Sequence, residues 1–152
     1  MKTLNTLAIS VLLATGFGAF AQEPHHHDAH AKTHSESSYK KPVQKFIGDE
    51  NLKTGMKTVL TTMKSMLQDK SKERTRLQKD TALKIEKTVQ EMFKKCKLAA
   101  DADAAVHPML ADILQGAKLI SEAKESLGHE MIHKALLRYD ESFKQTGLNL
   151  TN

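Results

Sequence analysis

The sequence predicts an all-α protein, an antiparallel up-down-up-down four-helix bundle preceded by a signal peptide and a disordered, histidine-rich tail. Three observations lead to this prediction. The first 21 residues form an apolar stretch behind one lysine, the following residues offer almost nothing that could build a core, and from residue 49 apolar residues recur at intervals of three and four. We therefore divide the chain into residues 1–21, 22–45 and 46–152.

The N-terminal residues have the organisation of a secretory signal peptide. Lys2 supplies the positive charge, residues 4–20 are uncharged and mostly apolar, and the small residues Ala19 and Ala21 fit a signal peptidase site. The apolar stretch is shorter than the roughly 20 residues that span a bilayer. We therefore expect cleavage after Ala21, no membrane association of the mature chain, and a location in the periplasm.

Charge and cysteine content narrow the class of protein. Removing the signal peptide takes away one of the 23 basic residues and none of the 18 acidic ones, which leaves 22 against 18, or about +4. The lysines alternate with acids rather than forming a patch, and export separates the chain from nucleic acid, so we exclude nucleic acid as a partner. The single cysteine, Cys96, excludes an intramolecular disulfide. Packing alone must stabilise the fold.

The predicted tail is rich in histidine and contains no side chain suited to a core before Tyr39. Its five histidines are His25, His26, His27, His30 and His34. Imidazole coordinates zinc, copper and nickel, and a disordered chain can place two to four imidazoles around one ion. The tail is therefore a candidate metal collector. The alternative is a solubilising linker whose histidines have no function.

The apolar spacing predicts a first helix over residues 49–68, with Asp49 as its N-cap, and a second helix over residues 71–97. The predicted inward faces are Leu52, Met56, Val59, Leu60, Met63 and Leu67 in the first helix, and Ala82, Ile85, Val89, Met92 and Cys96, with Phe93 beside them, in the second. On this face Cys96 acts as a small apolar residue. The alternatives are a metal ligand and an intermolecular disulfide.

A short link leads to a third helix capped by Asp101 or Asp103, and a fourth helix is predicted over residues 128–145, with Gly147 as its stop. The inward residues are Val106, Leu110, Ile113, Leu114, Ala117 and Ile120 in the third helix, and Met131, Ile132, Ala135, Leu136, Tyr139 and Phe143 in the fourth. Pro108 either kinks the third helix after its first turn or marks where its regular part begins.

The predicted topology brings Cys96 and His107 to the same end of the bundle, because they flank the link between the second and third helices. A thiolate and an imidazole supply two of the four ligands of a tetrahedral metal site. Asp101, Asp103, Met109 or a histidine of the tail could provide the third. The alternative is a cysteine in the core with His107 exposed beside it.

His129 and His133 are spaced i, i+4, which places both imidazoles on one helical face in the geometry of metal-binding pairs. The topology puts them near Met63 or Met66. With Glu130 they match the five-residue pattern of zinc proteases. A protease also needs a third ligand and a substrate cleft, so we expect no catalysis. The pair is a candidate metal site, and the alternative is a spacing that arose by chance.

Three segments carry a resemblance to a known family: KCKLAADADAAVH over residues 95–107, LADILQGA over 110–117 and DENLKTGM over 49–56. With the signal peptide and the histidine-rich segment, they resemble the DnrO-like group of small exported bacterial proteins. The resemblance covers roughly residues 49–143. It implies a helical periplasmic protein associated with copper and other heavy metals, with Cys96 and His107 as its characteristic pair.

These features predict a periplasmic protein that binds copper or zinc, with the tail as collector and Cys96 and His107 as a firmer site. One alternative is a structural or stress-related module that binds another envelope protein without a specific metal site. A second is a bundle that binds b-type haem through methionine and histidine. We expect no enzymatic activity, because no nucleophile with its base and no phosphate-binding loop is present. The sequence leaves the oligomeric state open.

Overall fold

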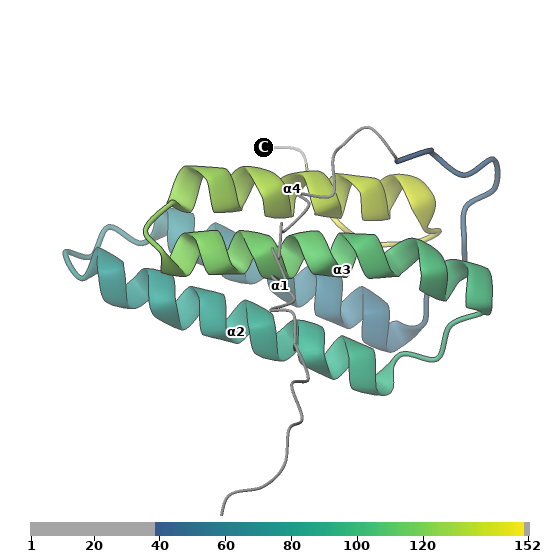
Figure 1. Cartoon of the computed structure of the whole chain (residues 1–152), viewed down its shortest axis with the longest axis horizontal. Helices are drawn as coiled ribbons and strands as arrows, with labels where there is room; N and C mark the ends of the chain where they lie inside the picture. Colours follow the sequence, from purple (N-terminus) through teal and green to yellow (C-terminus); the bar gives the residue numbers. More distant parts are fainter. Residues whose placement is uncertain (1–38, 151–152) are drawn as a thin grey trace, which may run out of the picture. The chain divides into compact units, whose positions relative to one another are not determined.

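The computed structural model describes residues 39–150, so the predicted signal peptide and the five histidines of the tail lie outside the described residues. The described part contains α1 (Glu50–Gln68), α2 (Arg74–Lys95), α3 (Ala100–Ser121) and α4 (Glu125–Ser142) (Figure 1). Each helix packs against the one that follows it, which confirms the predicted all-α, up-down-up-down four-helix bundle. Within residues 39–150, none of the helices has both the length and the apolar character that a bilayer crossing needs.

α1 begins where the sequence predicts, because Asp49 caps it. The Oδ1 atom of Asp49 accepts a hydrogen bond of 2.8 Å from the N–H of Leu52. One predicted core position is wrong: Leu67 is 48% exposed, whereas Met66 is only 1% exposed. At 100° per residue, Met66 lies nearer than Leu67 to the middle of the face formed by the other buried residues of α1, which are Leu52, Gly55, Met56, Val59, Leu60, Thr62 and Met63.

α2 is shorter than predicted at both ends and runs from Arg74 to Lys95. Its last turn closes when the N–H of Cys96 donates to the oxygen of Met92, and Cys96 then leaves the helix with extended backbone. Cys96 is therefore a half-buried C-cap residue rather than a member of the helical stripe. Phe93 also departs from expectation, since its ring is about half exposed.

α3 begins at Ala100 with Ala99 as its N-cap, so neither Asp101 nor Asp103 is the capping residue. Both lie in the first turn, where their charges favour the positive end of the helix dipole. The helix continues through Pro108. Pro108 is exposed, as is Ala104 four residues before it, so the carbonyl that lacks a proline N–H partner faces water.

α3 and α4 meet at two glycines. A Cβ at Gly116 would lie 2.8 Å from the backbone oxygen of Gly128, and a Cβ at Gly128 would lie 2.4 Å from that of Gly116. No side chain fits in such a space, so glycine at both positions sets the approach of the two helices. Ile120 and Ile132 pack around the contact. Gly128 thus lies inside α4, which begins at Glu125, three residues before the predicted start.

The end of α4 is set by the chain segment before α1. The N–H of Phe46 donates to the oxygen of Ser142 at 2.8 Å, and the N–H of Lys144 donates to the oxygen of Phe46 at 2.9 Å. This parallel bridge takes the chain out of the helical path after Ser142, so α4 ends before the predicted residue 145. Gly147, with a φ of +64°, lies beyond the helix and is not its stop.

The predicted tail includes residues 39–45, which contact α4 in the structure. The hydroxyl of Tyr39 lies 2.8 Å from that of Ser142, and the guanidinium of Arg138 lies over the Tyr39 ring. Lys45 donates to a backbone oxygen of α4 at 2.8 Å. The contacts of Tyr39 and Lys45 attach this segment to the bundle. The sequence did not predict this, because the segment has no periodic apolar pattern.

The contact between Gly116 and Gly128 predicts that two glycine-to-alanine substitutions destabilise the fold to different extents. Helix propensity alone would favour Gly128→Ala by about 1 kcal/mol. The overlap with the backbone of Gly116 cannot relax without separating α3 from α4, so we expect a net loss of about 2 kcal/mol in urea unfolding. Gly55→Ala is the control, because the atoms nearest to its Cβ belong to the side chain of Met92 rather than to backbone. That side chain can move, so its cost should be under about 1 kcal/mol. Equal costs would contradict this account of the packing.

Candidate metal site

Asp49 joins the start of α1 to the end of α2. Besides capping α1 through Leu52, its carboxylate accepts a hydrogen bond of 2.6 Å from the N–H of Lys97 and another from the thiol of Cys96. Asn51 reinforces the junction, since its side-chain amide donates to the oxygen of Lys95 at 3.1 Å. We call this set of contacts the Asp49 clamp.

The clamp determines the chemistry of the cysteine. Burial, together with the negative charge of Asp49, raises the pKa of Cys96 to about 12. Burial also raises the pKa of Asp49, but the hydrogen bonds from Lys97 and Leu52 outweigh it and leave this pKa below its ordinary value. Cys96 is thus a neutral thiol that donates to a carboxylate, whereas a metal ligand must be a thiolate.

His107 lies on the exposed side of α3, where its surroundings are structural. Its Nδ1 atom lies 2.7 Å from the backbone oxygen of Asp103, and its ring packs against that of Phe93, with centroids 5.4 Å apart. Cys96 instead bonds to Asp49. The predicted pair therefore shares one end of the bundle but has separate hydrogen-bond partners.

Among residues 39–150, no three His, Cys, Asp or Glu side chains gather closely enough to hold a metal ion. The predicted third ligands near Cys96 do not complete a site there: Asp101 accepts from the N–H of Ala102, Asp103 lies beside His107, and Met109 is buried in the core. Any metal chemistry in the described part of the chain must therefore rest on two of these ligands or include another type of donor.

His129 and His133 are the predicted ligands that the structure does bring together. Their rings lie on one face of α4, nearly parallel at 7°, with centroids 6.0 Å apart. Two nitrogens bound to one ion at about 2.0–2.1 Å are no more than about 4.2 Å apart, a separation that side-chain rotation can reach from this spacing. Both residues are half-buried. The spacing of the two rings is therefore compatible with a chelating pair.

The histidine pair lines a cavity of about 140 Å³ between α1 and α4. The cavity is bounded by Leu60, Met63, Lys64, Leu67, His129, Ile132, His133, Leu136 and Leu150. Apart from the imidazoles, the one potential metal ligand in this set is the thioether of Met63. The sequence already placed Met63 near these histidines. Leu150 had no pattern to reveal it, because it follows the last helix.

A charged network borders the pair at the start of α4. Arg74 forms a bidentate ion pair with Glu125, which also accepts a hydrogen bond of 2.9 Å from Gln78. Burial raises the pKa of Glu125, but the hydrogen bonds from Arg74 and Gln78 keep it below its ordinary value. Glu125 is thus an anion at the start of α4.

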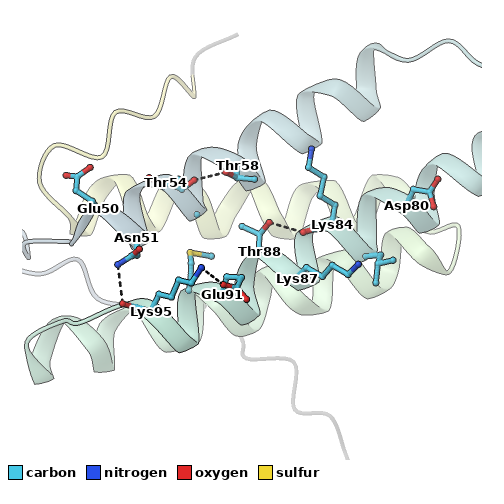
Figure 2. Close-up of a pocket in the computed structure, with 13 residues that line it drawn as sticks. Glu50, Asn51, Thr54, Thr58, Asp80, Lys84, Lys87, Thr88, Glu91 and Lys95 are labelled. Atoms are coloured by element: carbon cyan, nitrogen blue, oxygen red, sulfur yellow. Dashed lines mark hydrogen bonds and ion pairs between the residues drawn. The ribbon is translucent and has the colours of Figure 1, made fainter.

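A larger groove lies between α1 and α2, and none of the predicted ligands lines it. Its volume is about 620 Å³. Figure 2 shows threonine hydroxyls on both walls and Lys84 reaching from α2 towards α1, while Lys95 pairs with Glu91 at 2.6 Å. Met92 and Leu83 provide apolar surface. The lining holds three acids and three lysines (Glu50, Asp80, Glu91, Lys84, Lys87 and Lys95), so the groove has no charge preference.

Comparison with known proteins gives no match, whether with family models, with curated proteins or with solved structures. The resemblance to the DnrO-like group thus stays a prediction. The function has to be argued from the chemistry of the residues described above.

The Asp49 clamp predicts a pH-dependent stability. Asp49→Ala should lower the free energy of unfolding by about 2 kcal/mol at pH 7. Because the pKa of Asp49 is lower in the folded state, this contribution is complete above the unfolded value of about 3.9 and is lost as the pH falls through the folded pKa. In urea unfolding, the difference in free energy of unfolding between the parent and Asp49→Ala should therefore be smaller at pH 3 than at pH 7. Asp80→Ala, an exposed control, should stay within about 0.5 kcal/mol, and a gap that is constant with pH would refute the clamp.

The same clamp predicts an unreactive thiol. At pH 8, iodoacetamide should alkylate Cys96 in the folded protein at least about a hundredfold more slowly than in the urea-unfolded chain, because the raised pKa leaves little thiolate. Asp49→Asn should accelerate the reaction in the folded protein, since it removes the neighbouring charge. Mass spectrometry measures both rates. Similar rates in folded and unfolded chains would be incompatible with the clamp.

Proposed function

We propose that this chain is an exported metal-binding protein that handles copper, with zinc as the competing ion, and that its ligands are histidines. The observation that carries the proposal is the parallel pair His129 and His133 beside Met63 in a cavity. Imidazole and thioether donors suit copper in both oxidation states. The resemblance to the DnrO-like group supports the same class of function.

In this proposal Cys96 and His107 have structural roles. Cys96 contributes a thiol hydrogen bond to the Asp49 clamp, and His107 covers the exposed ring of Phe93. The five tail histidines act as the collector, and the pair on α4 provides the site within the bundle. Metal capture therefore belongs to the tail and to the start of α4.

An interaction module remains the second candidate, and the groove between α1 and α2 is the observation that favours it. Its volume lies in the range of ligand pockets, roughly 300–1,000 Å³. A haem group is less favoured within residues 39–150, because the cavity beside the histidines measures only about 140 Å³ and the larger groove is lined by no histidine.

Metal titration of the mature chain separates these functions. In a background where the five tail histidines are replaced by serine, the bundle should still bind one copper ion at micromolar concentration or below. His129→Ala with His133→Ala should weaken this binding by more than about tenfold, since even outer-shell groups change metal affinity by about 10- to 100-fold.

His107→Ala and Cys96→Ser are the matched controls and should bind like the parent. Equilibrium dialysis with copper(I), copper(II) and zinc provides the measurement. If the intact chain binds none of the three ions at micromolar levels, the proposal is wrong and the interaction module becomes the better account. Loss of binding in the His107 or Cys96 variants would return the site to the other end of the bundle.

A further inference from the structure

The chain after α4 doubles back over the histidine pair. Leu150 lines the same cavity as His129 and His133, which lie in the first half of α4, although Leu150 follows the last residue of that helix. Leu148 and Leu150 are both half-buried against the core. Residues 145–150, which we call the strap, therefore run back along α4 and cover the gap between α4 and α1.

The strap is firmly attached at its beginning. Thr146 is buried, and its hydroxyl donates to the carboxylate of Asp140 on α4. Gln145 and Gly147 on either side have φ values of +50° and +64°. At Gly147 a Cβ would meet nothing within 4 Å, so only the backbone conformation, which glycine adopts without strain, calls for glycine there. The hinge of the strap is thus next to a fixed anchor.

Beyond Gly147 the strap is only partly buried. The ammonium group of Lys64 on α1 donates to the backbone oxygen of Asn149 at 3.0 Å, and Leu148 and Leu150 contribute half-buried apolar surface. Partial burial of this kind is typical of segments that open locally while the rest of the fold stays intact.

The closed strap works against a cation at the histidine pair in two ways. Leu150 occupies one wall of the cavity, and the bond to Asn149 holds the positive charge of Lys64 on the strap side of the same cavity. When the strap leaves, Leu150 goes with it and Lys64 is free to extend into water. Opening therefore removes a steric and an electrostatic barrier together.

We propose that the strap, residues 145–150, regulates access to His129 and His133 by opening at Gly147. The inference rests on the proposed function only for the identity of the ligand, a copper ion. The apparent affinity of such a site is reduced by the fraction of molecules that are open. Changes that weaken the strap should therefore expose the pair and speed its occupation.

Histidine modification tests the strap without any metal. Diethyl pyrocarbonate acylates accessible imidazoles, and peptide mapping by mass spectrometry assigns the rate to each histidine. Leu150→Ala removes the side chain that covers the pair, and Gly147→Ala strains the hinge without touching the core. We expect each variant to be modified about fivefold faster at His129 and His133 and at an unchanged rate at His107.

Leu137→Ala, which truncates an exposed leucine of α4, is the matched control and should react like the parent. Protection of Cys96 from iodoacetamide reports an intact fold, so a variant that has lost this protection is replaced by the other one. Unchanged rates at His129 and His133 in a folded variant would overturn the strap.

Stopped-flow mixing with copper, in the background without tail histidines, separates this inference from the proposed function. Faster association in Leu150→Ala and Gly147→Ala supports both. Faster modification with no copper binding to any variant overturns the proposed function and leaves the strap as a cover of the pair. Copper binding with no change in either rate overturns the strap and leaves the function standing.

Discussion

The contact between Gly116 and Gly128 fixes how α4 sits in the bundle. With their backbones almost touching, α3 and α4 can neither rotate nor slide without a collision. His129 and His133 lie on a different side of α4 from Gly128 and face α1 across a cavity. The orientation of the candidate ligands is therefore a consequence of two glycines at the contact between α3 and α4, on a side of α4 that the histidines do not share. The cavity exists because α4 packs against α3 more intimately than against α1.

At the other end of the bundle, hydrogen bonds to the carboxylate of Asp49 join the helices, in place of close backbone packing. Asp49 has no positively charged partner in its clamp. It accepts from the N–H of Leu52 in the first turn of α1, from the N–H of Lys97 just after α2, and from the thiol of Cys96. A metal ion bound to Cys96 would displace the thiol proton. Cys96 could then no longer donate a hydrogen bond to Asp49, and the junction between α1 and α2 would weaken. The same residues cannot serve well both as a clamp and as a metal site, which separates the structural end of the molecule from the end that carries the histidine pair.

The sequence predicts the fold well because apolar spacing and one strong cap, Asp49, specify the helices directly. It fails at Cys96 and at the end of α4, where contacts between distant segments override local pattern, as with the bridge between Phe46 and Phe143. For the site, the i, i+4 spacing of His129 and His133 is sufficient to predict the pair. The covering Leu150 belongs to no periodic segment, and the proton on Cys96 depends on a carboxylate 47 positions earlier in the chain, so neither follows from local sequence.

At the proposed site, the charge of the ion and its preference for soft donors determine which ion binds best. The cavity has mostly apolar walls and holds Lys64, while Glu125 at the start of α4 is already engaged by Arg74 and Gln78. The cost of moving an ion from water into such surroundings grows with the square of its charge, so a divalent ion is penalised about four times as heavily as a monovalent one. Copper(I) also gains from the thioether of Met63, a soft donor that contributes little to zinc. The bundle site is thus better suited to copper(I), whereas imidazole alone, the donor that the tail histidines offer, favours copper(II) over zinc.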